Sequence, residues 1–157
     1  MKKIILTTGL LAGTLDILAA FIQSYLMANV VPSTVLKYIA SGVFGKSAYS
    51  GGVEMQIWGL LFHFIIAFAC TISYFLLYPK FKLLKNYWLV GSVLIAIIAW
   101  AVSNWIIIQM SQIAMRSFQL SKVIMAITIL FFCIGIPIGY RAHTFYKDNF
   151  KSNLSLK

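Results

Sequence analysis

Four runs of apolar residues, each long enough to cross a membrane as a helix, constrain the fold more than any other feature of this sequence. They cover about 4–31, 57–78, 87–109 and 119–140. A bilayer has a hydrocarbon core roughly 30 Å thick, which about 20 helical residues span. Lipid offers the backbone no hydrogen-bonding partners, so such runs are stable there only as helices. The sequence therefore predicts an all-α fold, an integral membrane four-helix bundle.

The composition agrees with a membrane protein. The chain is 61% hydrophobic and 10% charged, whereas an ordinary soluble domain carries about 25% charged residues. A soluble domain of this length could not hide so much apolar surface in one core. We expect a single transmembrane domain over residues 1–146 and a flexible cytoplasmic tail over residues 147–157.

Lysines and arginines lie at the ends of the apolar runs and predict the orientation of the chain. Cytoplasmic loops of membrane proteins are enriched in these residues. Both termini are therefore predicted to lie in the cytoplasm. The larger group is Lys2, Lys3, Lys80, Lys82, Lys85, Arg141, Lys147, Lys151 and Lys157, and the smaller group is Lys37, Lys46, Arg116 and Lys122.

The formal net charge of +10 does not indicate nucleic-acid binding. The basic residues form no stripe on a water-facing domain, which a nucleic-acid interface would need. At the ends of apolar runs they attract anionic lipid headgroups instead. The predicted partner is the lipid bilayer and not a nucleic acid.

Segment 33–54 predicts an additional amphipathic helix in the first outer loop. Its apolar residues recur at helical spacing opposite Thr34, Lys37 and Ser41, and Pro32 precedes it as a helix start. The helix is too short to cross the membrane. We expect it to lie on the outer surface or to dip back into the bundle, and to be followed by a glycine-rich turn.

Small residues mark the predicted contact faces of the helices. In lipid, helices associate by close packing, which small residues permit. Gly9 and Gly13 form a GxxxG pair in the first run, and Gly59 begins a stripe in the second. We expect these three glycines to serve helix packing.

Asp16 is the most informative residue, because a carboxylate inside a bilayer costs at least roughly 2.5 kcal/mol and is a candidate functional group. From the helical rise, we place it about 12 Å below the outer end of its helix, and His63 about 9 Å below the outer end of the next. The matched depths predict an Asp16–His63 pair inside the bundle. Two roles stay open for it: a hydrogen-bonded pair that fixes helix register, or a protonatable pair in a proton or ion path.

Three amide side chains lie toward the same outer end: Gln23, Asn104 and Gln109. They predict the rim of a polar outer vestibule. The alternative is that they are interfacial amides in contact with lipid headgroups.

No motif predicts an enzyme, a cofactor or a metal. The sequence holds no HExxH, no GxSxG nucleophile elbow and no Cys/His cluster at metal-ligand spacing. Cys70 and Cys133 are single cysteines within apolar runs, where thiols usually fill the core.

The first half of the chain resembles a family. Gly13-Thr14-Leu15-Asp16, then 39–45 (Ile-Ala-Ser-Gly-Val-Phe-Gly), Gly51-Gly52, and Gly59 with His63 form a layout similar to that of small uncharacterised bacterial inner-membrane proteins of the YagU-like group. The resemblance implies a multi-pass protein of the bacterial inner (cytoplasmic) membrane, in a group loosely linked to acid tolerance and without an established activity.

Two functions remain open on the sequence. One is a proton-linked or small-solute transport component that uses the Asp16–His63 pair. Because four helices make a thin pore wall, this function favours a homo-oligomer with a path between protomers. The alternative is a non-transporting structural or interaction protein in which the pair only fixes packing. The small molecule or ion is not named by the sequence.

Overall fold

A computed structural model describes the backbone of residues 1–110 and 119–155, and the side chains of residues 1–104 and 119–148. All secondary structure in these residues is helical. The elements are α1 (Lys2–Ala28), α2 (Pro32–Phe44), α3 (Ser47–Ser50), α4 (Val53–Leu77), α5 (Lys82–Asn86), α6 (Trp88–Met110), α7 (Leu120–Leu130), the π-helical turn η1 (Phe131–Gly135) and α8 (Ile136–Ser155).

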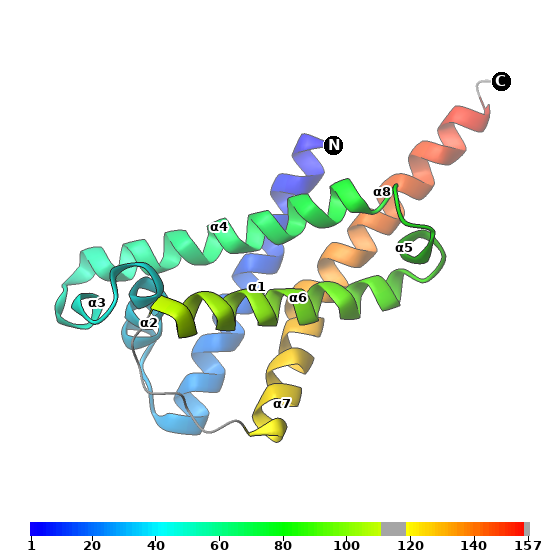
Figure 1. Cartoon of the computed structure of the whole chain (residues 1–157). Helices are drawn as coiled ribbons and strands as arrows, with labels where there is room; N and C mark the ends of the chain where they lie inside the picture. Colours follow the sequence, from blue (N-terminus) through cyan, green and yellow to red (C-terminus); the bar gives the residue numbers. More distant parts are fainter. Residues whose placement is uncertain (111–118, 156–157) are drawn as a thin grey trace.

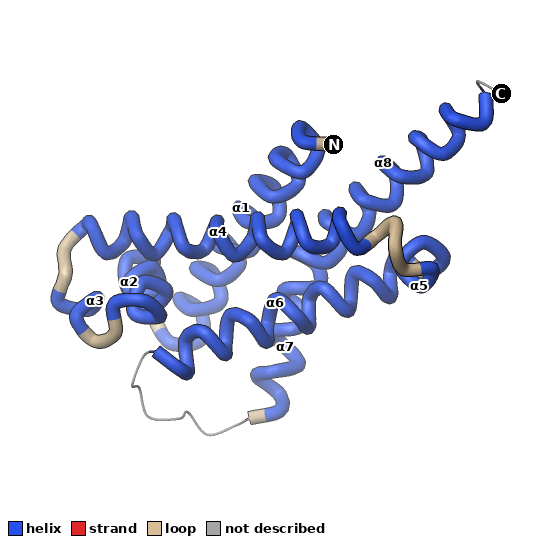
Figure 2. The backbone as a smooth tube through the Cα atoms, turned by 45° about the horizontal axis from the view of Figure 1, so that its top comes forward, coloured by secondary structure: helices blue, strands red, loops and turns tan. Residues whose placement is uncertain are grey.

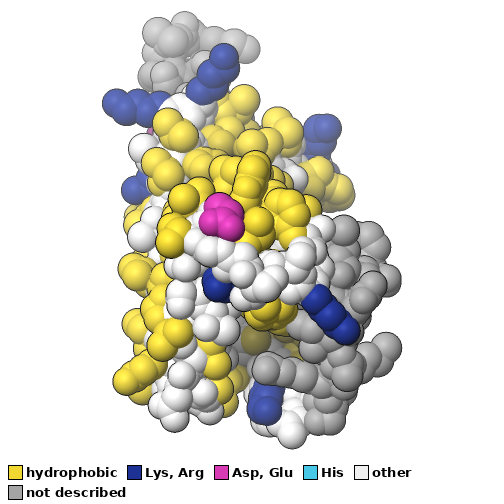
Figure 3. Space-filling model, turned by 90° about the vertical axis from the view of Figure 1, so that its left-hand side faces the viewer, with side chains coloured by type: hydrophobic (Ala, Val, Ile, Leu, Met, Phe, Trp, Pro, Cys, Tyr) yellow, Lys and Arg dark blue, Asp and Glu magenta, His cyan; other side chains and the backbone are white. Residues whose placement is uncertain are grey.

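Three helices are long enough and apolar enough to cross a membrane. They are Lys2–Ala28, Val53–Leu77 and the continuous helix Leu120–Asp148. Large apolar side chains stay exposed along them, for example Leu18 on α1 and Ile65 on α4. Figure 3 shows hydrophobic side chains over much of one face of the molecule, with few charged groups between them. These features fit a membrane protein, in which lipid covers such surfaces.

The long helices form a crossed arrangement. α4 and α6 run side by side in opposite directions, and α1 and the α7–η1–α8 rod cross them (Figures 1 and 2). Both chain ends lie at the end of the molecule that carries α5, and α2 and α3 lie at the opposite end. At the end that carries α5, two hydrogen bonds join α8 to its neighbours. Tyr146 donates its hydroxyl proton to the Phe75 carbonyl of α4 at 2.8 Å, and Arg141 donates to the Thr7 hydroxyl of α1 at 3.0 Å.

Local signals explain the helix boundaries at the α2 end. α1 stops where Asn29 adopts a left-handed conformation with φ 50°, a common helix end. Pro32 is the first residue of α2, where its missing N–H costs nothing. α2 ends at Gly45, whose φ of 62° favours a glycine. A helix thus occupies the place where the sequence predicts the additional one, and the following glycine-rich segment contains the short helix α3.

The first two predicted packing glycines lie between α1 and α4. A Cβ added at Gly9 would meet the ring of Phe68, and one added at Gly13 would meet Phe64 and Ala67. The glycines therefore admit α4 side chains into the surface of α1.

Gly59 packs on a different partner. A Cβ added there would meet the backbone carbonyl of Leu36 in α2. Next to this backbone contact, the ring of Phe44 in α2 packs against Trp58 and Phe62 of α4. The ring centroids are 5.9 and 5.8 Å apart. α2 is thus seated against α4, and its buried residues include Val35 and Ala40.

The last helix extends beyond its predicted end. The apolar run that predicts this helix ends at residue 140, but α8 continues to Ser155. It therefore enters segment 147–157, whose predicted flexibility remains a prediction. The buried Ala142 packs in the core with Tyr78 and Phe75 of the α4 end, which gives this extension an apolar face.

The turn η1 has a local cause. Pro137 lacks the N–H that would bond to the carbonyl of Cys133 four residues earlier. The π-helical turn Phe131–Gly135 ends two residues before Pro137, and such turns accommodate a break in the ladder of helical hydrogen bonds.

Replacing Gly59 by alanine tests the α2–α4 contact. Alanine is the better helix former by about 1 kcal/mol, yet we expect Gly59→Ala to lower the free energy of unfolding by about 1–3 kcal/mol, because its methyl group meets the backbone of α2. Thermal unfolding in detergent measures this. Gly51→Ala is the control, because its methyl group meets only the flexible Met55 side chain and backbone three residues away. Equal stability of the two variants would contradict the contact.

Candidate functional site: a polar cavity around Asp16 and His63

Asp16 of α1 and His63 of α4 lie next to each other. The His63 Nδ1 and Asp16 Oδ2 atoms are 3.9 Å apart. The side chains are 11% and 18% exposed for His63 and Asp16, respectively. Each is therefore mostly enclosed by protein, and the nearest charged partner available to the carboxylate is the imidazole.

The other ring nitrogen of His63 bonds to the backbone of α1. Nε2 lies 2.8 Å from the carbonyl oxygen of Gly13. A carbonyl oxygen only accepts, and its two lone pairs can serve both a helical N–H and the imidazole, so Nε2 carries a proton and donates it. A Cβ at Gly13 would meet Phe64 and Ala67, so the glycine lets α4 come close to the backbone of α1, and the hydrogen bond to its carbonyl positions His63 beside Asp16.

This tautomer determines how the pair holds protons. With Nε2 protonated, a neutral His63 presents the lone pair of Nδ1 toward Asp16. A carboxylate oxygen facing a lone pair is unfavourable, and one proton placed on either group removes the conflict. Two singly protonated forms are chemically open to the pair, an imidazolium beside a carboxylate and a carboxylic acid beside a neutral imidazole, and at 3.9 Å the two atoms do not form a direct hydrogen bond.

The pair lines a cavity of about 460 Å³ between α1, α2, α4, α6 and the α7–η1 segment. Two of the three amides predicted to rim a vestibule, Gln23 and Asn104, also line it. The side chain of the third, Gln109, lies outside the residues whose side chains are described. α2 contributes Val35 and Tyr38 to the wall, so this helix closes part of the cavity.

The two amides each make a contact along their own helix. Gln23 donates to the sulfur of Met27 at 4.0 Å, and Asn104 donates from Nδ2 to the carbonyl of Trp100 at 2.9 Å. These contacts use one amide proton each and leave the carbonyl oxygens available as acceptors. The cavity thus combines two ionisable side chains with amide oxygens from α1 and α6.

Sequence reasoning did not assign three further residues to this cavity: Tyr38 of α2, and Trp100 and Ser103 of α6. Ser103 is a small polar residue within an apolar helix, which is typical of a face that contacts other helices. Tyr38 and Trp100 gave no signal in the sequence, because interfacial aromatic residues have the same appearance as aromatic residues that line a cavity.

A second histidine belongs to the opposite end. The ring nitrogen Nδ1 of His143 shares a 2.8 Å hydrogen bond with the Tyr78 hydroxyl. Trp88 stacks on the same imidazole at a centroid distance of 6.2 Å, and Tyr146 stacks on Tyr78 at 5.3 Å. This aromatic cluster joins α4, α6 and α8, and it does not line the cavity.

Among the residues that the structure describes, no three His, Cys, Asp or Glu side chains gather closely enough to hold a metal ion. No family model, curated protein or solved structure matches the chain. The resemblance to the YagU-like group therefore remains a prediction, and the function must be argued from the site itself.

A double-mutant cycle tests the contact between the pair. We expect Asp16→Asn and His63→Gln to be coupled by about 0.5–3 kcal/mol in the free energy of unfolding, because each change removes the partner of the other group. Denaturant unfolding in mixed micelles supplies the four free energies. Effects that add within about 0.3 kcal/mol would show that the two side chains do not interact.

Proposed function

We propose that the chain is a four-span protein of a bacterial inner membrane with both termini in the cytoplasm. α1, α4, α6 and α7–α8 would be the spans, and α2 would cover the outer end. Two observations support this. The chain ends and the lysine-rich turn around α5 share one end of the molecule. α6 runs from Trp88 to Met110, a length of about 34 Å at 1.5 Å per residue, which matches the bilayer.

Reporter fusions test this topology. We expect a fusion after Lys157 to report the cytoplasm and a fusion at Lys46, between α2 and α3, to report the periplasm, because positive charge concentrates at the first end. An enzyme reporter that is active only in the periplasm, paired with one that fluoresces only in the cytoplasm, gives opposite signals at the two sites. A periplasmic signal from the C-terminal fusion would reject the orientation.

We further propose that the protein is a proton-linked transport component for a small solute. The observation that carries this proposal is that two ionisable side chains, the Asp16 carboxyl group and the His63 imidazole, lie 3.9 Å apart and line a cavity of about 460 Å³ inside the helices. Sites for small molecules commonly have volumes of about 300–1,000 Å³. Ionisable residues within membrane helices mark proton and substrate paths.

The chemistry of the cavity suggests how proton binding and solute binding would be connected. Loading the Asp16–His63 pair with a proton removes the negative charge of the carboxylate or balances it with the imidazolium. The amide oxygens of Gln23 and Asn104 would accept hydrogen bonds from a solute in the same space. Solute binding would then depend on whether the pair holds its proton, which is the coupling that a proton-linked carrier needs.

One observation favours the alternative function. The hydrogen bond from His63 to the Gly13 carbonyl ties α4 to the backbone of α1. A non-transporting structural or interaction protein could use the pair in this way, only to fix the register of two helices. In that case an amide at position 16 would preserve most of the contacts, because it keeps the size and one acceptor oxygen.

A proton-flux assay separates the two functions. In proteoliposomes with an imposed pH gradient and an internal pH-sensitive dye, we expect Asp16→Asn to slow proton flux by at least about 100-fold, since an amide does not exchange a proton. The matched control is Glu54→Gln. Glu54 lies in the first turn of α4 and accepts a hydrogen bond from the Gly52 backbone at 2.9 Å, outside the cavity.

The control should retain the flux of the native chain, and both variants should keep a cooperative thermal transition. Flux that is absent from the native chain, or equal in the native chain and Asp16→Asn, would support the packing function instead.

A further inference from the structure

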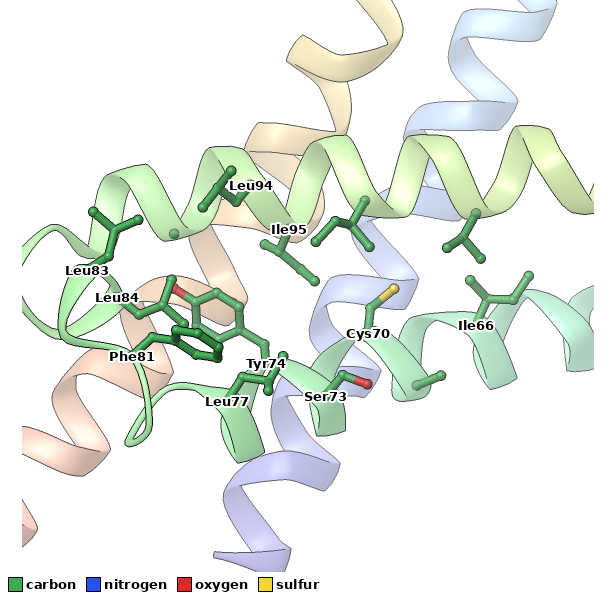
Figure 4. A pocket seen from close by; sticks show the side chains of 14 residues that line it. Ile66, Cys70, Ser73, Tyr74, Leu77, Phe81, Leu83, Leu84, Leu94 and Ile95 are labelled. Carbon is green, nitrogen blue, oxygen red and sulfur yellow. The ribbon is translucent and has the colours of Figure 1, made fainter.

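A second hollow lies between α4 and α6, at the end that carries the chain termini (Figure 4). It has a volume of about 510 Å³, and its lining is almost entirely apolar. Leu77 and Cys70 line it from α4, and Leu94 and Ile98 from α6. The turn that contains α5 closes the end of this groove with Phe81, Leu83 and Leu84.

The groove has the length of one leaflet of a bilayer. Its lining on α4 runs from Ile66 to Leu77, which is about 16 Å along the helix axis. This is half of the roughly 30 Å hydrocarbon core. An apolar slot of this length, between two helices that expose apolar side chains to lipid, matches one acyl chain of a phospholipid.

A polar group on the wall of the groove lacks a partner. The Tyr74 side chain is only 4% exposed, and its hydroxyl has no hydrogen-bond partner among the described residues. In Figure 4 the Tyr74 ring projects from α4 toward Leu84. A Cβ at Gly91 would collide with this hydroxyl, so the glycine in α6 leaves the space that the hydroxyl occupies. Buried hydroxyl groups normally have an acceptor, and none is supplied here by the residues that the structure describes.

Positive charge without acidic partners lies at the same end. Lys80, Lys82 and Lys85 alternate with the groove-lining residues of the turn, and all three are exposed. The chain has only three acidic side chains, and none of them forms a salt bridge with these lysines. No acidic side chain of the protein therefore neutralises these lysines, and their charge is available to an anion from outside the protein.

We propose that the groove between α4 and α6 is a binding site for an anionic phospholipid, with an acyl chain along the groove, an ester carbonyl accepting from the Tyr74 hydroxyl, and the phosphate held by Lys80, Lys82 and Lys85. Tyr74 lies three residues before the end of α4 at Leu77, hence about 4.5 Å inside it, at the depth where the apolar core meets the headgroup layer. The proposal is independent of the proposed transport, because only Ile66 lines both the groove and the cavity.

Native mass spectrometry from detergent tests the site, with equal amounts of phosphatidylglycerol and phosphatidylcholine that carry the same acyl chains. We expect the native chain to retain one phosphatidylglycerol in preference to phosphatidylcholine by at least tenfold. The triple change of Lys80, Lys82 and Lys85 to Gln should abolish the preference, since each lysine near a lipid surface contributes about fivefold. The control removes the same charge at the same end but away from the groove, with Lys2, Lys3 and Lys147 changed to Gln.

Two further variants locate the lipid. Ala69→Phe fills the groove from an exposed position on α4 and should reduce retention of both lipids at least tenfold, whereas Ala101→Phe, exposed on α6 outside the groove, should not. Tyr74→Phe removes only the hydroxyl and should weaken retention several-fold without harm to the fold. This variant carries the test if Ala69→Phe does not fold.

Several results would overturn the proposal. The native chain could show no preference for phosphatidylglycerol, or the two triple variants could lose that preference equally. Lipid retention could be unchanged in both Ala69→Phe and Tyr74→Phe. A second copy of the chain could occupy the groove in place of lipid.

Discussion

The rest of the structure depends on the contact of α1 with α4 at Gly13. Apolar side chains gain little by leaving lipid for one another, so close packing and a few polar contacts must hold membrane helices together. At Gly13 both occur at one place. The glycine admits Phe64 and Ala67 against its backbone, and its carbonyl accepts the imidazole of His63. This bond orients the imidazole so that its second nitrogen faces Asp16, which lies almost one turn further along α1.

From this contact the cavity follows geometrically. α1 and α4 are held close at Gly13, and α2 is held to α4 where Gly59 meets the Leu36 carbonyl. α6 packs against η1, where a Cβ added at Gly135 would meet the backbone of Ser92 in α6. Glycines thus set three close approaches, and the larger residues between them, such as Phe62 and Trp100, keep the helices apart around the remaining space. A buried carboxylate in that space is tolerable because the imidazole lies within reach.

Much of this arrangement could be predicted from the sequence, because membrane depth is a one-dimensional quantity. Helix length, the rise per residue and the positions of lysines place Asp16 and His63 at similar depths. Which side of a helix faces which neighbour is a different matter. Gly59 lies about one helical turn before His63, yet it meets α2 and not α1, because a glycine pattern indicates that something approaches closely but not which helix does so.

The remaining features depend on tertiary contacts without a local signal. Tyr38 and Trp100 line the cavity although aromatic residues at these positions are equally suited to a membrane interface. The extension of α8 past residue 140 arises from contacts with the distant Tyr78 and Phe75. After residue 140 the sequence becomes more polar. Such a change in polarity is typical of the end of a membrane span, although here the helix itself continues.

The two hollows of the molecule differ in chemistry although α4 and α6 line both. On α6, Ala99 and Ser103 face the cavity, while Ile98 and Val102 face the groove, so adjacent faces of one helix separate a polar space from an apolar one. Ile66 of α4 is the one residue shared by the two linings. An acyl chain in the groove would therefore contact the side chain that also bounds the space around His63. Coupling between two sites requires that a ligand in one distinguish two arrangements of the other, and among the described residues the side chain of Ile66 is the shared contact through which a lipid in the groove could do so.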